Sequence, residues 1–415
     1  MKKILLGTTA LVGAVLVSQA ALADAPKVTV GGSSEFEAGL LSGDDQSGGQ
    51  VNATPNNGQS NRAFYTRNEV SLKVDGKSDA GLGYGSEIWL QADTSGDQNG
   101  RGVNATRTFV YLDGMWGRVE MGSNYGADDT LKVDAGTIAR ATGGIDGDWR
   151  FFANNRLGNP FIATSDLPIN YGATGTGLSG AGTFGGGTPN GFGNQSTENI
   201  NKVTYYTPKW YGLQAGLSYA PNDSNRGQTL GRTDHGAPIT VGGATGGVAA
   251  STISSAHDIW QGGIGYNGQW NQVGFGLSAT GEHGQADATS YHDLNAWALG
   301  AKASYLGFSA AGSYGDWGKS LRTGTSVSTN RFWTLGGAYE YGPYGLSVTY
   351  LGSKYDNAIA STDKFRNIVV GADYKLAPGL TPYAEVAFYN EDGQGTGHGV
   401  DNSGQLFLLG TQLNF

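Results

Sequence analysis

The sequence contains no cysteine, so disulfides cannot hold its fold together, and small disulfide-stapled secreted domains are excluded. Charged residues make up only 15% of the chain, and the formal net charge of −9 argues against a nucleic-acid partner. Long apolar runs are also missing, because none approaches the roughly 20 residues that a membrane-spanning helix needs. Stability must therefore come from packing and backbone hydrogen bonds.

Glycine is abundant, with 71 residues among 415, and tyrosine follows with 21, a composition that favours strands and turns over helices. Residues 1–23 have the pattern of an export signal, because Lys2 and Lys3 precede an apolar run that ends before an Ala21-Leu22-Ala23 cleavage site. No linker or change of composition divides the remainder. We therefore expect a signal peptide over residues 1–23 and a single domain over residues 24–415.

The predicted mature region repeats a unit of about ten residues with alternating polarity, which is the pattern of a membrane-spanning β-strand. In one such unit the apolar positions are Leu213, Ala215, Leu217 and Tyr219, and the small or polar positions between them are Gln214, Gly216 and Ser218. A charge facing lipid costs ~2–4 kcal/mol at mid-membrane. The strand charges fall on the polar face, as at Glu69, Lys73, Arg107, Lys202 and Glu385. The alternation predicts a lipid-facing side and a wet interior lined by small polar side chains.

The predicted strands are joined alternately by short turns and long polar loops. The short turns are Asp75 to Gly81, Asp113 to Gly117, Pro208 to Tyr211, Asn267 to Asn271, Leu306-Gly307, Tyr341 to Tyr344 and Ala377 to Leu380. The long loops are residues 42–61, 94–104, 123–198, 221–256, 283–290, 318–328, 356–363 and 391–402. Seven turns and eight loops give sixteen strands. An even number of antiparallel strands predicts an all-β transmembrane barrel, closed because an open sheet edge in lipid leaves backbone groups unsatisfied.

Aromatic residues cluster at both predicted rims, where amphipathic rings meet the membrane interfaces. At the short-turn ends they are Trp116, Trp210, Tyr211, Trp270, Tyr305, Tyr341 and Tyr344. Near the long-loop ends they are Trp260, Trp317, Trp333, Tyr355 and Tyr389. Ordinary packing explains any single one of these rings equally well, so the clustering at both rims carries the prediction.

Three stretches resemble Gram-negative outer-membrane proteins. Gln405 to Phe415 is similar to their closing strand, in which the terminal Phe forms part of the assembly signal. Arg107 to Gly126, with the pattern F-V-x-L…G-x-x-x-x-G-x-N-Y-G, and Asn199 to Pro221 resemble the strands on either side of the inward-folded third loop of the general bacterial porins. The resemblance implies a homotrimer of sixteen-stranded barrels in the bacterial outer membrane, in contact with lipid and lipopolysaccharide. It also implies passive diffusion of ions and small hydrophilic solutes through a pore that residues 123–198 narrow.

The resemblance further implies a constriction with carboxylates on this loop and basic residues on the facing wall. By position, the basic wall is Arg67, Arg107 and Lys202, and the loop acids are Asp128, Asp129, Asp134, Asp146 and Asp148. Gly143 to Asp148 occupies the place of the loop tip, and further basic partners within the loop are Arg140, Arg150 and Arg156. Because the acids outnumber the wall bases, and charges at the narrowest point set ion preference, we expect mild cation selectivity.

Other functions are weaker interpretations of the same residues. A substrate-selective channel for sugars or phosphate would need an aromatic ladder or a deep basic cluster, and Phe109 and Tyr111, on the polar side of their strand, are the one hint. A non-conducting structural or adhesive barrel is the alternative from another class. The sequence offers no nucleophile with a general base positioned beside it, so nothing in it indicates an enzyme. We expect no cofactor. Calcium at Asp128-Asp129 or at Asp146 and Asp148 is the alternative to a charged pore lining.

Overall fold

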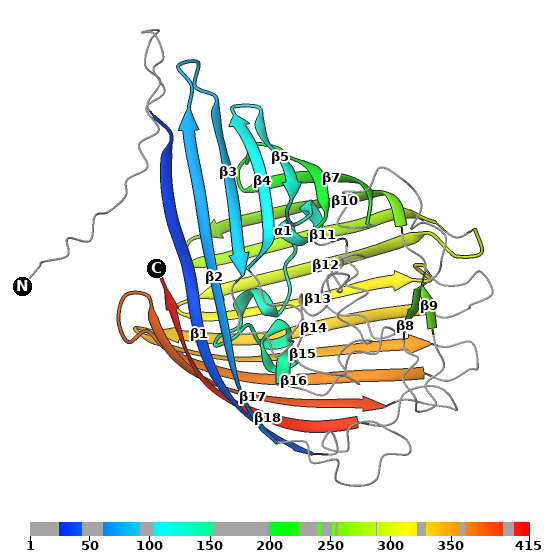
Figure 1. Cartoon of the computed structure of the whole chain (residues 1–415). Helices are drawn as coiled ribbons and strands as arrows, with labels where there is room; N and C mark the ends of the chain where they lie inside the picture. Colours follow the sequence, from blue (N-terminus) through cyan, green and yellow to red (C-terminus); the bar gives the residue numbers. More distant parts are fainter. Residues whose placement is uncertain are drawn as a thin grey trace, which may run out of the picture.

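The computed structural model describes residues 25–43, 61–91, 103–152, 197, 199–223, 239–241, 251–253, 256–287, 289–321, 329–356, 362–392 and 402–415. Within this described part, sixteen strands close into one antiparallel barrel (Figure 1). The predicted export signal and most of the predicted third loop, including Arg156, lie outside the described residues. Among the described residues no helix has the length and hydrophobicity needed to cross a membrane.

The barrel strands follow one another around the wall in chain order. They are β1 (Lys27–Gly43), β2 (Arg62–Lys77), β3 (Gly83–Gln91), β4 (Asn104–Gly114), β5 (Gly117–Ser123), β6 (Asn201–Tyr206), β7 (Leu213–Asn222), β10 (Ala256–Trp270), β11 (Val273–Ala286), β12 (Leu294–Tyr305), β13 (Phe308–Gly318), β14 (Thr329–Tyr341), β15 (Tyr344–Asp356), β16 (Thr362–Tyr374), β17 (Leu380–Asp392) and β18 (Asn402–Asn414). A separate two-stranded sheet joins β8 (Ile239–Val241) to β9 (Ser251–Ile253). The sequence-based prediction of a sixteen-stranded antiparallel barrel is confirmed.

The barrel closes where the first strand meets the last. Strand β1 pairs with β18 from Ser33 opposite Asn414 to Gly43 opposite Gly404. Beyond the ladder, the Gly32 N–H donates to the Phe415 carbonyl at 2.9 Å, and the Phe415 N–H donates back to the Gly32 carbonyl at 3.0 Å. The chain end is therefore tied into the seam, which leaves no open edge there for lipid to meet.

The short connections have the geometry that tight hairpins need. Between β12 and β13 the turn is Leu306-Gly307, with φ angles of 48° and 85°. A left-handed conformation at both positions twists the turn in the same sense as the strands, which is why two-residue hairpins favour it. Glycine adopts this conformation without strain at the second position. The remaining turns likewise fall at or beside the positions predicted from the sequence, as at 271–272 and 342–343.

Alternation along the strands sorts side chains between lipid and lumen as predicted. On β15, Leu346 and Val348 are 51% and 47% exposed on the outer face, whereas Ser347 and Thr349 are 2% and 0% exposed on the inner face. The aromatic girdle at the short turns is also confirmed by large outward exposures, including 73% for Trp270 and 71% for Tyr341.

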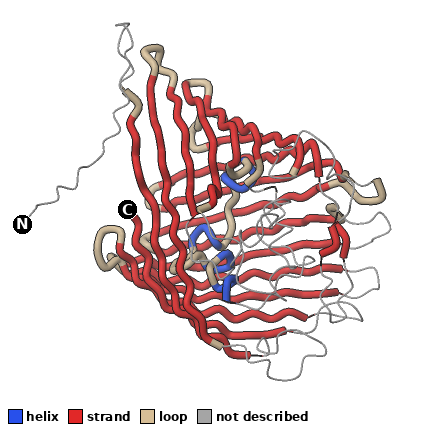
Figure 2. The backbone as a smooth tube through the Cα atoms, in the orientation of Figure 1, coloured by secondary structure: helices blue, strands red, loops and turns tan. Residues whose placement is uncertain are grey.

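The interior is less polar than the sequence pattern predicted. Tyr389 and Trp317 were expected in the interfacial girdle, but both are buried, at 3% and 7% exposure. The inner faces of β14 to β18 add apolar side chains that form one cluster with them: Phe332, Leu351, Phe365, Val369, Leu406 and Leu408. The prediction of an interior lined by small polar side chains was wrong in this sector, because part of the chain packs against the wall there and forms an apolar core with it. Figure 2 shows the short helices of the chain lying inside the barrel.

We predict that Val348→Arg lowers the free energy of unfolding by about 2–4 kcal/mol, because it places a charge against lipid in the middle of β15. Urea unfolding of the protein in phospholipid vesicles measures this. Ser71→Arg is the matched control on β2, where Ser71 shares the inner face with Glu69 and Lys73. It should change stability by no more than roughly 0.5 kcal/mol. Equal losses in both variants would contradict the assignment of the two faces.

Candidate pore constriction

Residues 124–152, here called the inner segment, leave β5 and run along the inside of the barrel wall (Figure 1). The segment contains α1 (Ala127–Leu131), two short 3₁₀ turns, η2 (Gly136–Ile138) and η3 (Gly144–Asp146), and α2 (Trp149–Phe152). Helix α1 contacts β7, β10 and β11, η2 contacts β13 and β14, η3 contacts β15 and β16, and α2 contacts β18. The segment therefore lines one continuous sector of the wall.

Hydroxyl side chains on the wall accept hydrogen bonds from backbone N–H groups of the inner segment. The pairs are Ala127 to Ser218 (2.9 Å), Val133 to Ser278 (2.9 Å), Ala135 to Thr334 (3.2 Å) and Arg140 to Ser347 (2.9 Å). A segment with so little regular structure has few backbone partners of its own, and buried N–H groups must be satisfied. The small polar residues of the inner face thus supply the missing acceptors.

Wall glycines give the inner segment the space to approach this closely. A Cβ atom at Gly300 of β12 would lie 1.8 Å from the Val133 carbonyl oxygen, and one at Gly371 of β16 would lie 2.7 Å from that of Arg140. Both distances are too short for any side chain. These glycines are needed because only a wall without a Cβ at these points admits the backbone of a second layer.

Aromatic stacking fixes the far end of the segment. The Trp149 ring stacks on Phe365 and on Tyr389, with ring centroids 6.3 Å apart in each case. Its indole N–H donates to the Gly144 carbonyl at 2.9 Å, so the buried polar atom has a partner. Phe152 follows, with its ring against Gly39 of β1 and near Tyr65 of β2. Helix α2 therefore packs against the apolar sector of the lumen.

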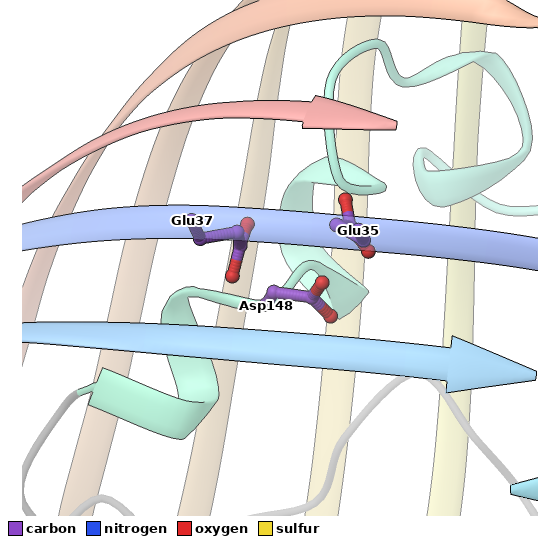
Figure 3. A group of neighbouring side chains, drawn as sticks. All are labelled: Glu35, Glu37 and Asp148. Carbon is purple, nitrogen blue, oxygen red and sulfur yellow. The ribbon is translucent and has the colours of Figure 1, made fainter. Parts of the chain in front are cut away.

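One of the predicted wall bases meets one of the predicted loop acids. Arg67 on β2 lies 3.5 Å from Asp148 between guanidinium nitrogen and carboxylate oxygen, and also 3.4 Å from Glu69. Asp148 adjoins Glu35 and Glu37 on β1, as Figure 3 shows. All three carboxylates are buried. The sequence analysis missed Glu35 and Glu37, although their alternation with the outward-facing Phe36 would have placed them in the lumen.

More polar contacts surround this group. The Tyr383 hydroxyl of β17 lies 2.6 Å from a Glu35 oxygen and 2.7 Å from a Glu37 oxygen, and its one hydrogen is shared between the two carboxylates. Glu385, two residues along the same strand, accepts hydrogen bonds from the hydroxyl and the backbone N–H of Thr142 at 2.9 to 3.3 Å. The inner segment is therefore joined through acidic side chains to β1 and β17 as well as to β2.

A second buried acidic group lies at the start of the inner segment. Lys202 of β6 is 4% exposed and donates to the Thr197 carbonyl at 2.8 Å. Its charge acts on Asp128, which is 1% exposed, and on Glu282 of β11. Burial raises the pKa of Asp128 above its ordinary value, and the nearby Lys202 only partly offsets this. Lys202 and Asp128 are thus brought together, but inside the wall contact rather than across an open pore.

The remaining predicted residues have different surroundings. The Arg107 guanidinium lies over the rings of Trp89 and Tyr125, 4.1 and 4.6 Å from their centroids, an arrangement stabilised by cation–π attraction. Lys132 lies 3.0 Å from Asp129 and 4.0 Å from Asp134, so the segment neutralises part of its own charge. Asp146 is half-buried in η3.

Inward-facing charges of both signs line β2 to β5. Lys73 lies 3.3 Å from Asp75, and Arg118 lies 2.6 Å from Glu120. The Arg118 guanidinium also covers the Tyr111 ring at 3.8 Å, while the Tyr111 hydroxyl donates to Asp75. Phe109 is buried on the same face. Tyr111, which the sequence offered as a hint of a substrate-selective channel, is therefore part of this mixed-charge wall.

We predict that Gly300→Val displaces the inner segment, because its side chain would collide with the Val133 backbone. Limited trypsin digestion should then cut faster after Lys132, with the strand content by circular dichroism unchanged. Gly337→Val is the control, since a Cβ at Gly337 meets its nearest atom, the Ser309 carbonyl oxygen, at 4.0 Å. Identical cleavage rates in the two variants would show that the close approach at Gly300 does not hold the segment.

A second prediction concerns pH. A carboxyl whose pKa is raised on folding binds its proton more tightly in the folded protein than in the unfolded chain. Asp128 should therefore lower the free energy of unfolding as pH rises from about 4, the ordinary Asp value, through its raised pKa. Asp128→Asn should reduce this fall between about pH 4.5 and 7.5 in urea unfolding, whereas Asp129→Asn, at a half-buried acid, should leave it in place. The same pH dependence in wild type and Asp128→Asn would contradict the assignment.

Comparisons with known proteins agree with this architecture. The family described as Gram-negative porin matches residues 7–394. An uncharacterized protein of Rickettsia bellii is 26% identical over 393 residues, covering 85% of each chain, and one of Rickettsia typhi is 28% identical over 385 residues, covering 80% of each.

Two solved structures illustrate the likeness of fold. A mutant of the Rh. blastica porin superposes with a TM-score of 0.54 at 15% identity, and the anion-selective porin from Comamonas acidovorans with 0.55 at 17% identity. Each match covers 94% of this chain and 100% of the other. At these identities the structures show the shared fold alone. The family match, which spans most of the chain, shows more: this protein belongs to the Gram-negative porin family, the β-barrel channels of the outer membrane, which are not enzymes.

Proposed function

We propose that the protein is a general diffusion porin, a water-filled channel through which ions and small hydrophilic solutes cross the outer membrane without an energy source. The observation that carries this proposal is the course of the inner segment. It is hydrogen-bonded along one sector of the wall from β7 to β15, and its far end reaches β18. The segment narrows the lumen from one side, and the charged face of β2 to β5 lies on another sector of the barrel.

The proposed channel has a mild preference for cations. Arg67 lies in the field of three carboxylates, Asp148, Glu69 and Glu35, so this group holds more acids than bases. In surroundings of low effective dielectric, two charges ~4 Å apart interact by about 4 kcal/mol, against about 1 kcal/mol in water. Charges more than a Debye length of ~8 Å from the constriction are largely screened by salt. The surplus of buried acids therefore supports cation preference.

The proposal also covers how the protein is exported and how it assembles in the membrane. We infer a homotrimer embedded in outer-membrane lipid and lipopolysaccharide, removal of residues 1–23 during export, and a role for Phe415 in recognition by the assembly machinery. The family resemblance supports the trimer. The position of Phe415 supports its role, because the residue is 62% exposed although its backbone is hydrogen-bonded to Gly32.

A substrate-selective channel is the second candidate. Arg107, which lies over the rings of Trp89 and Tyr125, favours it, because aromatic rings beside a guanidinium group suit planar or sugar-like solutes. Such a channel would show conductance that one solute blocks in a saturable manner. A non-conducting adhesive barrel would show no conductance steps at all.

We predict that the refolded mature protein gives single-channel steps in planar bilayers, in groups of three for a trimer, with a reversal potential in a salt gradient that favours cations. Arg67→Gln should increase this preference, because it removes the positive charge that faces Asp148 and Glu69. Arg331→Gln is the matched control: Arg331 lies on the outer face of β14 and pairs with Asp356. Its reversal potential should equal that of wild type. Anion preference in the wild type would overturn the proposed selectivity, and absence of steps would overturn the channel.

A further inference from the structure

The group of carboxylates at Asp148 has the geometry of an ion site. Glu35, Glu37 and Asp148 each offer one oxygen, and these oxygens lie within 4.8 Å of one another. Two oxygens on opposite sides of a calcium ion are about 4.6 to 5.2 Å apart, because Ca–O distances are ~2.3–2.6 Å. Figure 3 shows Glu35 and Glu37 projecting from β1 beside Asp148, which comes from the inner segment between η3 and α2. The spacing therefore matches a shared cation.

A buried oxygen without a partner provides independent support. Glu37 is 0% exposed, and although its Oε1 accepts from Tyr383, its Oε2 has no hydrogen-bond partner within the described part of the chain. A buried carboxylate oxygen without a hydrogen bond costs more free energy than a buried neutral oxygen without one, because the carboxylate is charged. Such an atom in a native structure calls for a ligand that supplies the missing interaction.

The charges around this atom are unbalanced. Glu37 lies in the negative field of Asp148, Glu35 and Glu385. Arg67 approaches Asp148 at 3.5 Å but shares its guanidinium with Glu69 at 3.4 Å. Within the described residues, this one monovalent group is divided between two carboxylates and does not balance the three acids of the cluster. A divalent cation would neutralise more of this charge. Buried charges in proteins are generally paired or bound to metals.

The donor set selects the kind of metal. The atoms on offer are carboxylate oxygens, without nitrogen or sulfur, and hard cations take such ligands. Magnesium requires a near-ideal octahedron and keeps its water, whereas calcium accepts irregular sets of six to eight oxygens. The cluster combines side chains from a rigid strand and an irregular segment, which suits the less demanding ion.

We propose that Glu35, Glu37 and Asp148 bind a divalent cation, calcium by its chemistry, that clamps the inner segment to β1. The clamp acts at the seam of the barrel, because β1 pairs on one side with β18 and on the other with β2. It also acts just before α2, whose Trp149 sits in the apolar sector. Bound calcium would therefore hold the last part of the inner segment in place, and it would also reduce the negative charge that these carboxylates present to the lumen.

Calcium binding can be measured on the mature protein in detergent micelles after EDTA treatment and removal of the chelator. Isothermal titration with calcium chloride should give one saturable site per chain. Glu37→Gln should weaken the apparent affinity by about 100-fold or more, since loss of even an outer-shell partner costs 10- to 100-fold. Glu87→Gln is the control, because Glu87 of β3 lies outside the cluster and accepts from Trp89 at 2.6 Å. It should bind calcium as wild type does.

A second readout tests the clamp without any variant. Calcium should slow trypsin cleavage at Arg140 in the wild-type protein, and EDTA should restore it, while magnesium at the same concentration should have a smaller effect. Absence of saturable calcium binding in the wild type, or equal binding in wild type and Glu37→Gln, would overturn the proposal. The cluster would then be held by protons shared between its carboxyl groups.

This site and the proposed channel can fail separately. Bilayer conductance recorded in EDTA reports on the pore alone, and titration in micelles reports on the cation alone. Conductance that persists in EDTA together with saturable calcium binding supports both. Conductance without binding removes only the clamp, and binding without conductance removes only the diffusion channel.

Discussion

The need to hydrogen-bond every backbone group in a lipid bilayer is the constraint on which this structure depends. The wall meets it by closing β1 on β18, and the bonds between Gly32 and Phe415 extend that seam to the last residue. Closure fixes which residues face inward along most of each strand, because side chains alternate between the two faces, with register shifts such as the one between His257 and Trp260 on β10. The inward or outward direction of most strand side chains follows from this one condition.

The inner segment faces the same requirement with a different solution. Its backbone has little regular structure, so Ser218, Ser278, Thr334 and Ser347 serve as its hydrogen-bond acceptors, while Gly300 and Gly371 allow it to lie close enough to reach them. The small residues that look merely polar in sequence thus have a specific structural task. At the end of the segment the wall presents apolar side chains in place of hydroxyl groups, and Trp149 packs against them.

Placing a second layer against the wall also buries charge. Asp128, Asp148, Glu37 and Glu385 are almost wholly shielded from solvent, and they meet fewer bases than acids. Asp148 keeps its ion pair with Arg67, whereas burial favours the protonated form of Asp128. The mechanical attachment of the segment and the electrostatics of the pore are consequently properties of the same side chains, which links ion preference to the position of the segment.

Sequence by itself determined the barrel, its strand number, its turns and its outer face, because lipid imposes a period of two and a strong penalty for misplaced charge. It also identified the acids and bases, and the pairing of Arg67 with Asp148 was within its reach. It did not determine which of them meet: Glu35 and Glu37 are more than a hundred residues from Asp148, and Arg107 found aromatic rings instead of acids. Alternation also places Phe332 and Leu408 on the inner face, but it does not show whether an inward-facing residue joins a buried apolar cluster, as these two do, or faces water. Only the tertiary structure decided these contacts, because they depend on where an irregular segment crosses a wall that strand periodicity describes one strand at a time.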